Sequence, residues 1–280
     1  MILPVQKDLY AVVGNPVGHS LSPAMMNAVF RSLGIPAVYV ALQSDSFAED
    51  LVTLEKMGFR GLSVTIPHKE AAFRLASPQD KNTWAIGAVN TLKRGSKGWE
   101  GRNTDWLGAM WALKGKTALA GRRALVIGAG GAARALVYGL KREGARPTVA
   151  NRSVERGKSL AHDFDCGFLP LADLERTASD HSFDVVVQCT PLGLAGGEPV
   201  SPVPKSLFRP GMVVMDTVYR PMRTPFAILA EEAGCTLVPG LEMLLHQGVA
   251  QLEWWLERPV PADRGVNVMR EALLEALESE

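Results

Sequence analysis

The sequence Ala124-Leu-Val-Ile-Gly128-Ala-Gly130-Gly131-Ala-Ala133-Arg134 predicts a buried strand, a tight turn and a helix that stops near Gly144. In the dinucleotide-binding fingerprint, one glycine permits the turn, another admits a pyrophosphate close to the backbone, and a small residue keeps the helix near the sheet. The free N–H groups at the helix start would face the anion. An ordinary strand–helix turn is the alternative. The residues expected to bind a dinucleotide are Gly128, Ala129, Gly130, Gly131 and Ala132.

The end of the next strand bears on the choice of dinucleotide. Residues 147–150 are followed by Asn151-Arg152-Ser153, about 20 residues beyond the glycines, where an NAD site usually carries an acid for the ribose 2′-hydroxyl. A guanidinium can instead hold a 2′-phosphate through two hydrogen bonds. Arg156 lies one helical step further on. A solvated arginine at a strand end is the alternative, but after these glycines Arg152 favours NADP.

Length and composition limit the class of protein. With 280 residues the chain is long enough for two domains, and its net charge of +1 gives no sign of a general binder of nucleic acid or of membrane surfaces. Cys166, Cys189 and Cys235 lack metal-ligand spacing and predict reduced thiols in the cytoplasm. Residues 1–5 are too short for a signal sequence, and no apolar run is long enough to cross a bilayer.

Strands and helices alternate in the first half, with strands expected at residues 9–13, 38–42 and 62–66. Ser20 and Ser22 lie at a strand-to-helix junction, where they could bind a small polar ligand. The alternative is that Ser22 caps the helix, with Pro23 at its first position, which leaves Ser20 available.

Further polar residues follow strand ends in this half. Lys69 comes after the third strand, in an expected loop held by Pro67, where it could act on a ligand or be simply solvated. Asn90 and Asp105 each lie at the edge of an element. His19 and His68 have no third ligand at metal spacing, so no metal site is expected.

The second half continues the alternation, with strands expected at residues 183–188, 211–216 and 236–238. The first of these ends in Cys189-Thr190-Pro191, which belongs at the crevice where open α/β sheets bind ligands. A long apolar helix is expected from Gly240 to about residue 257. Within it, Gln247 is either an exposed polar residue or an inward ligand contact. A last amphipathic helix, residues 266–277, could pack back on the first domain.

Eight motifs follow one another along the chain: Gly14-Asn-Pro-Val-Gly-His-Ser-Leu-Ser-Pro23, Val64-Thr-Ile-Pro-His-Lys69, Gly87-Ala-Val-Asn-Thr91, Asn103-Thr-Asp105, Gly128-Ala-Gly-Gly-Ala132, Asn151-Arg-Ser153, Asp216-Thr-Val-Tyr219, and Gly240-Leu-Glu-Met-Leu244 through Gln247. On these motifs the chain resembles the shikimate dehydrogenase family over nearly its whole length. The departures from the family pattern are Ser63 for the usual Asn, Gln188-Cys189 for Asn-Ala, and Trp106 for Gly.

The resemblance implies an NADP-dependent enzyme that reversibly reduces 3-dehydroshikimate to shikimate in aromatic amino-acid biosynthesis. It implies Lys69 and Asp105 as the catalytic pair and leaves open which of them donates the proton. It implies that Ser20 and Ser22 bind the substrate carboxylate, and that Thr65, Asn90, Gln247 and Tyr219 complete the substrate site. The cofactor contacts that it implies are the glycine-rich turn, Asn151, Arg152, Ser153, Arg156, Thr190, Gly240 and Met243.

The expected architecture is an α/β substrate domain followed by a Rossmann-type NADP-binding domain, with a cleft between them. We place the substrate-binding and catalytic domain at residues 1–104, the NADP-binding domain at 105–239, and C-terminal helices that return to the first domain at 240–280. A monomer or a homodimer is expected. Two alternatives remain: a quinate/shikimate paralogue with broader substrate or NAD use, and a non-catalytic ligand-binding regulator on the same fold.

Overall fold

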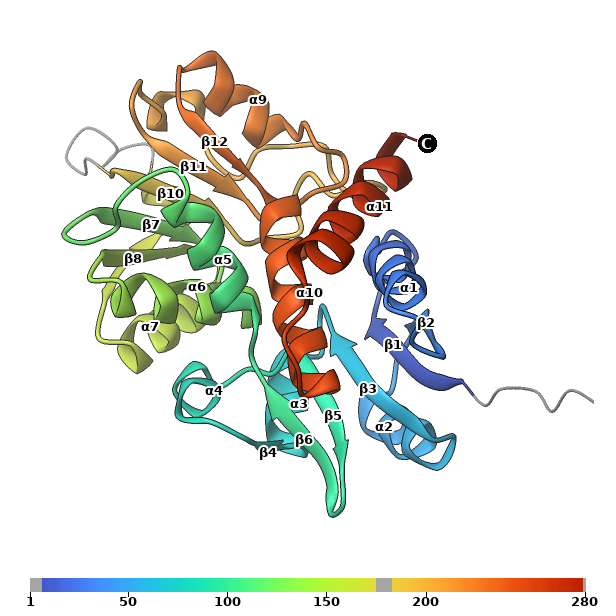
Figure 1. Ribbon diagram of the computed structural model, residues 1–280. Helices are drawn as coiled ribbons and strands as arrows, with labels where there is room; N and C mark the ends of the chain where they lie inside the picture. The colour runs from blue at the N-terminus through green and yellow to red at the C-terminus, as the bar shows by residue number, and fades with distance from the viewer. Residues whose placement is uncertain (1–6, 175–182, 279–280) are drawn as a thin grey trace, which may run out of the picture. The chain divides into compact units, whose positions relative to one another are not determined.

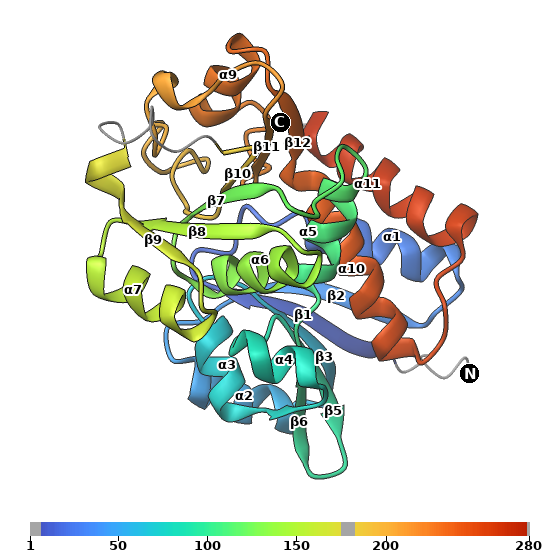
Figure 2. The ribbon, with the colours of Figure 1, turned by 90° about the vertical axis from the view of Figure 1, so that its left-hand side faces the viewer.

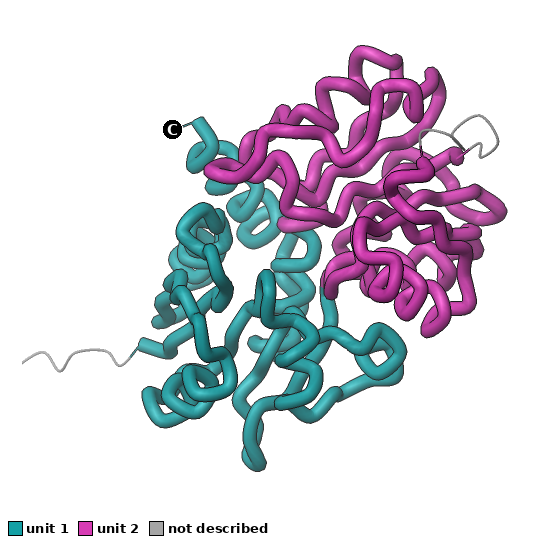
Figure 3. The backbone as a smooth tube through the Cα atoms, turned by 180° about the vertical axis from the view of Figure 1, so that it is seen from behind, with its two compact units in different colours: residues 1–104, 245–280 teal, residues 105–244 magenta. Residues whose placement is uncertain are grey.

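The computed structural model describes residues 7–174 and 183–278, so the expectation for residues 1–5 lies outside the described part. The chain divides into two compact units (Figure 3). Unit 1 comprises residues 1–104 and 245–280, and unit 2 comprises residues 105–244.

Unit 1 is built on a mixed six-stranded sheet in the order β2-β1-β3-β5-β6-β4. The central strand β1 is parallel to β2 and β3, whereas β5 is antiparallel to β3 and β6. The bounds are β1 (Asp8–Gly14), β2 (Ala37–Gln43), β3 (Phe59–Val64), β4 (Ser77–Pro78), β5 (Thr91–Gly95) and β6 (Gly98–Arg102).

The helices of unit 1 cover both faces of this sheet. Side chains alternate along a strand, so Leu62 and Val64 of β3 point to one face while Gly61 and Ser63 point to the other. The face with Leu62 packs in one apolar cluster with residues of α2. The helix bounds are α1 (Ser22–Ser32), α2 (Phe47–Lys56), α3 (Lys69–Leu75), α4 (Lys81–Ile86), α10 (Gly240–Leu256), which unit 1 shares from residue 245 on, and α11 (Asn267–Glu278).

On the opposite face, helix α10 approaches the sheet closely. A Cβ at Gly61 would lie 2.6 Å from the Trp255 ring, so a larger residue would push the helix away. Tyr10 packs against both Phe30 of α1 and Trp255 of α10, with ring centroids 5.3 and 5.0 Å apart. Helix α11 then lies along α1 (Figure 1).

Unit 2 contains a parallel six-stranded sheet in the order β12-β11-β10-β7-β8-β9. This is the doubly wound order, in which the chain runs outward from β7 to one edge and then from β10 to the other. The bounds are β7 (Arg123–Ile127), β8 (Arg146–Asn151), β9 (Gly167–Pro170), β10 (Val185–Gln188), β11 (Val213–Asp216) and β12 (Thr236–Pro239).

Helices cover the strands of unit 2, and Figure 2 shows α6 and α7 beside β7, β8 and β9. Phe226 and Ala230 of α9 share an apolar cluster with Leu125, Val186 and Val214 of the sheet. Parallel strands covered in this way read as continuous apolar runs, which is why the sequence predicted them well. The helix bounds are α5 (Asp105–Lys114), α6 (Gly131–Arg142), α7 (Val154–Asp163) and α9 (Pro225–Glu232). The predicted fold class, an α/β domain followed by a Rossmann-type domain, is confirmed.

Two local expectations were wrong. Lys69 is not in a loop but is the first residue of α3, with His68 as its N-cap. Ser22 is not a cap, because α1 already begins at Ser22 and its N-cap is Leu21. In both places the helix starts earlier than the sequence pattern suggested. Across the described residues, no helix has the length and apolar character needed to span a membrane.

Candidate active site

The predicted glycine turn lies between β7 and α6 in unit 2. Gly128 has φ +117°, which favours glycine, and its N–H donates to the Ala150 carbonyl at 2.8 Å. A Cβ at Gly128 would lie 3.2 Å from the Cys189 carbonyl oxygen and 3.3 Å from Thr190 Cγ2. The turn therefore lies against the end of β10, at the point where the strand order reverses and doubly wound sheets bind ligands.

The next glycine leaves room for a ligand. Gly130 is the N-cap of α6, and a Cβ built there would meet no described atom within 4 Å. Helix α6 starts at Gly131, and Ala133 is fully buried. The N-terminus of a helix thus has uncrowded backbone N–H groups beside it, an arrangement that suits a phosphate.

The segment after β8 presents one arginine outward. Ser153 Oγ accepts from Arg156 N at 3.4 Å and caps α7, and Asn151 Nδ2 donates to the Ser153 carbonyl at 2.8 Å. Arg156 Nη2 reaches the Ala129 carbonyl at 3.5 Å, which joins this segment to the glycine turn. Arg152 is exposed and makes no hydrogen bond or ion pair with another residue that the structure describes. Its guanidinium can therefore donate hydrogen bonds to an anionic ligand group.

Gln188 holds the loop after β10 in place, which sequence reasoning missed. Its side chain is fully buried. Nε2 donates to the carbonyl oxygens of Thr190 and Leu192, both at 3.0 Å, while Oε1 accepts from Thr190 N. The signal in the sequence was a polar residue at the end of an apolar strand, and it was noted only as a departure from the family pattern.

Asp216 has a similar anchoring role at the end of β11, and it too was missed. Thr224 Oγ1 donates to Asp216 Oδ2 at 2.5 Å and Val218 N donates to Oδ1 at 2.9 Å, so the carboxyl spans the loop that contains Tyr219. Burial raises the pKa of Asp216 to about 6, although both hydrogen bonds oppose this. A Cβ at Gly240 would lie 2.6 Å from the Asp216 carbonyl oxygen, so α10 begins directly against this strand end. Met243 is buried one turn later.

In unit 1, the polar residues follow the ends of the parallel strands β1 and β3. Ser22 is buried, and Ser20 Oγ accepts from Ser22 N at 3.3 Å, so the hydroxyl of Ser20 can still donate to a ligand. A Cβ at Gly14 would lie 2.3 Å from Thr65 Cγ2, so only glycine lets the two strand-end loops approach this closely. Thr65 N donates to the Val13 carbonyl at 2.9 Å.

The backbone around Lys69 is well anchored. His68 N donates to the Thr65 carbonyl and Val89 N donates to the Lys69 carbonyl, both at 2.9 Å. The His68 ring stacks on Phe47 with centroids 4.9 Å apart, and its Nε2 contacts the Ser44 carbonyl at 2.9 Å. His68 therefore has a structural role, and the described residues contain no group of three His, Cys, Asp or Glu side chains placed to hold a metal ion.

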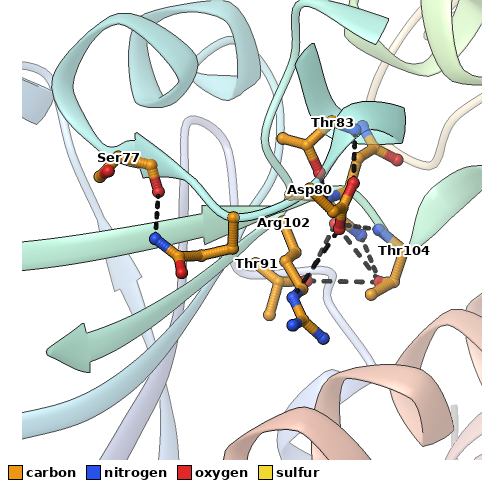
Figure 4. A network of polar contacts seen from close by, with 9 residues as sticks. Ser77, Asp80, Thr83, Thr91, Arg102 and Thr104 are labelled. Carbon is orange, nitrogen blue, oxygen red and sulfur yellow. Dashed lines mark hydrogen bonds and ion pairs between the residues drawn. The ribbon is translucent and has the colours of Figure 1, made fainter. Parts of the chain in front are cut away.

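Asn90 is the centre of a buried polar network in unit 1. Its Nδ2 donates to Thr104 Oγ1 at 2.9 Å and to Gln247 Oε1 at 3.1 Å. Its Oδ1 accepts from Thr104 N at 2.7 Å and from Thr91 Oγ1 at 2.9 Å. Figure 4 shows Thr91 and Thr104 pointing toward each other within this network. Gln247 is 7% exposed, so the expectation of an exposed polar residue is wrong, and its role as a ligand contact stays a prediction.

Strand β5 starts where the antiparallel strand β3 ends. The structure therefore brings together, near the carboxyl end of β3, the residues Thr65, Lys69, Asn90 and Gln247. Asp105 follows Thr104 directly in the chain and is the first residue of α5. In unit 2, Thr190 and Arg156 lie against the glycine turn. The chemistry of the two sets differs: unit 1 offers amides, hydroxyls and an amine to a polar ring, and unit 2 offers a helix N-terminus and a guanidinium to phosphates.

Both units match models of known protein families. Residues 12–92 match the shikimate dehydrogenase substrate binding domain, residues 111–193 match the shikimate / quinate 5-dehydrogenase model, and residues 240–274 match the shikimate 5′-dehydrogenase C-terminal domain. The chain is 61% identical to the NADP(+) shikimate dehydrogenase of Syntrophobacter fumaroxidans, over 100% of this chain and 98% of that protein.

Solved structures give the same result. Shikimate 5-dehydrogenase from Thermus thermophilus, in complex with NADP(H) and shikimate, is 35% identical with a TM-score of 0.84, over 96% of this chain and 100% of that one. Quinate dehydrogenase from Corynebacterium glutamicum, in complex with NAD, is 26% identical with a TM-score of 0.83, over 96% of this chain and 99% of that one. With matches that run through the sheet of unit 1, the glycine turn and α10, the chain belongs to the shikimate dehydrogenase family.

Proposed function

We propose that this chain is an NADP-dependent shikimate dehydrogenase, which reversibly reduces the ketone of 3-dehydroshikimate to the hydroxyl of shikimate. The observation that carries the proposal is the buried Asn90–Gln247 pair next to the segment that bears Lys69. A ring that carries several hydroxyls needs fixed donors and acceptors of this kind, since a hydroxyl left unpaired in a buried site loses binding energy. The 61% identity to an NADP(+) shikimate dehydrogenase supports the same reaction.

In the proposed substrate site, the hydroxyls of Ser20 and Ser22 bind the ring carboxylate, and Thr65, Asn90 and Gln247 bind ring hydroxyls. Both amide hydrogens of Asn90 already bind protein oxygens. A ring hydroxyl that binds Asn90 Nδ2 therefore replaces one of these bonds. The bond to Gln247, 3.1 Å against 2.9 Å for Thr104, is the longer of the two. Tyr219 completes the proposed set from unit 2.

The glycine turn with Ala129 and Ala132 would hold the pyrophosphate of NADP, and Arg152 with Ser153 and Arg156 its 2′-phosphate. Asn151, Thr190, Gly240 and Met243 are the other proposed cofactor contacts. The open space at Gly130 and the outward guanidinium of Arg152 support this assignment. When bound, NADPH supplies the hydride.

The catalytic step requires a proton as well as a hydride. Hydride addition to the ketone carbon leaves an alkoxide, which Lys69 or Asp105 protonates, and oxidation of shikimate returns the proton to the same pair. Residues 89 and 90 hold the backbone near both catalytic residues. Val89 N donates to the Lys69 carbonyl at 2.9 Å, and Asn90 Oδ1 accepts at 2.7 Å from the N–H of Thr104, the residue before Asp105. Val89 thus holds the backbone that bears Lys69, and Asn90 holds the residue before Asp105.

The test is a set of initial rates of shikimate and quinate oxidation, each with NADP and with NAD. We expect the shikimate–NADP pair to be fastest. A strong preference for quinate or NAD would instead support the paralogue alternative, and no turnover with any pair would support a ligand-binding regulator. Light scattering of the same sample distinguishes the two proposed oligomeric states, monomer and homodimer. We also propose a cytoplasmic location, because none of Cys166, Cys189 and Cys235 forms a disulfide.

A further inference from the structure

Beneath the proposed substrate site, unit 1 contains a second chain of buried hydrogen bonds that the reaction does not use directly. Tyr39 OH of β2 donates to Ser63 Oγ of β3 at 2.6 Å, and Ser63 Oγ donates to Gln251 Oε1 of α10 at 2.7 Å. Gln251 Nε2 then donates to the backbone carbonyl of Asn90 at 3.2 Å. The exposed fractions are 1% for Tyr39 and Gln251, 2% for Asn90 and 6% for Ser63. We refer to Tyr39, Ser63 and Gln251 as the relay.

The relay can adopt only one arrangement of its hydrogen atoms. The carbonyl oxygen of Asn90 can only accept, so the Gln251 amide must present Nε2 to it and Oε1 to Ser63. Ser63 must then donate to Gln251, and its oxygen is left to accept from Tyr39. Reversing the Gln251 amide would place its oxygen against the Asn90 carbonyl and leave buried donors unpaired, which is costly. The relay therefore fixes the orientation of Gln251.

Two glutamines on one face of α10 hold Asn90 from two directions. Gln247 and Gln251 are one helical turn apart. Gln247 Oε1 accepts from the side chain of Asn90, while Gln251 Nε2 binds its backbone. One further turn along, Trp255 Nε1 donates to the Leu92 carbonyl at 2.9 Å. This face of α10 is thereby bound in register along the start of β5.

We propose that Tyr39, Ser63 and Gln251 are positioning residues for substrate binding: they fix the Asn90 backbone and the register of α10, and so set how the Asn90 and Gln247 amides face the ring. This inference rests on the proposed function, because it takes Asn90 and Gln247 as substrate contacts. In this proposal none of the three is a substrate contact. They act because a rotation of α10 or a shift of residue 90 would break several buried hydrogen bonds at once.

Two relay variants and one matched control test the inference. Ser63→Ala removes both bonds of the central hydroxyl, and Tyr39→Phe removes only one hydroxyl while keeping the ring that packs against Trp255. The control is Tyr10→Phe. Tyr10 is the strand partner of Tyr39 and packs against the same Trp255, but it has no part in the relay.

We expect the KM for shikimate to rise roughly tenfold in Ser63→Ala and roughly threefold in Tyr39→Phe, the usual scale for lost buried hydrogen bonds. The KM for NADP should stay within about twofold in Ser63→Ala and Tyr39→Phe, and Tyr10→Phe should leave the KM for shikimate and the KM for NADP unchanged. These expectations hold even if a variant lowers the melting temperature. If Ser63→Ala does not fold, Tyr39→Phe with its control still decides the matter.

An unchanged KM for shikimate in the folded relay variants would overturn the inference while leaving the proposed function intact. An equal rise in KM for shikimate and NADP would also overturn it, because that result describes general destabilisation. A wild-type protein with no turnover of shikimate would overturn the proposed function, and this inference with it.

Discussion

At the scale of single residues, Lys69 combines a fixed backbone with a side chain that can exchange a proton. It begins α3, and its carbonyl accepts from Val89 N at 2.9 Å. We expect Lys69→Ala to lower kcat for shikimate oxidation at least ~100-fold with a small change in KM, the scale for a lost acid–base group. The control is Lys81→Ala, an exposed lysine of the same unit. Near wild-type turnover in Lys69→Ala would exclude Lys69 from catalysis.

Arg152 is the residue on which cofactor choice depends. It is exposed and follows the segment of β8 whose Ala150 carbonyl binds the glycine turn. We expect Arg152→Ala to raise the KM for NADP at least tenfold while barely changing the KM for NAD, because a charge-assisted bidentate contact contributes roughly 1.5–3 kcal/mol. Arg146→Ala, at the other end of β8, is the control. Equal effects on the two cofactors would place Arg152 away from the 2′-phosphate.

At the scale of elements, Asp216 ties the end of β11 to the start of α9. Its pKa of about 6 lies above the ordinary value of 3.8, because burial disfavours the charged form. The folded state therefore binds the proton more tightly than the unfolded state does. The stability gained in this way is complete below the ordinary pKa and is lost as the pH rises through about 6.

Asp216→Asn tests this pH dependence, because the amide does not titrate. The folded and unfolded pKa values differ enough that wild type should lose up to roughly 3 kcal/mol of unfolding free energy relative to Asp216→Asn between about pH 4 and about pH 7. Denaturant unfolding of both proteins across this range measures the difference. Asp263→Asn, an exposed site, should show no such trend. A constant difference between wild type and Asp216→Asn would contradict the raised pKa.

Elements differed in how well the sequence predicted them. The buried strands β7 and β10 were evident because parallel strands covered on both faces are apolar throughout. The short helices α3 and α4 were not predicted, since six or seven residues are too few for a helical repeat to stand out. Helix α4 is instead specified at its ends: Asp80 accepts from Thr83 N at 2.7 Å, and Gly87 ends the helix with φ +69°.

At the scale of the whole molecule, the two ligands are expected to protect different parts of the chain from hydrogen exchange. NADP should slow exchange at residues 128–132 and 151–156 of unit 2, and shikimate at residues 65–69 and 90–91 of unit 1. At about 100 times its Kd, each ligand stabilises the folded state by about 2.7 kcal/mol. Exchange measured by mass spectrometry with either ligand alone checks this. Protection of unit 1 by NADP alone, with none at residues 128–132, would contradict the assignment of the two sites.

The sequence by itself determined the two α/β halves, the glycine turn, the arginine after β8 and the polar residues that follow strand ends. These depend on local rules of periodicity, turn chemistry and charge, which can be read along the chain. Only the tertiary structure decided which buried polar groups bind each other. Gln251 reaches a residue 161 positions away, and Gln188 and Asp216 proved to be loop anchors. Such pairings depend on packing between distant segments, because a buried polar group must find a partner wherever the fold places one.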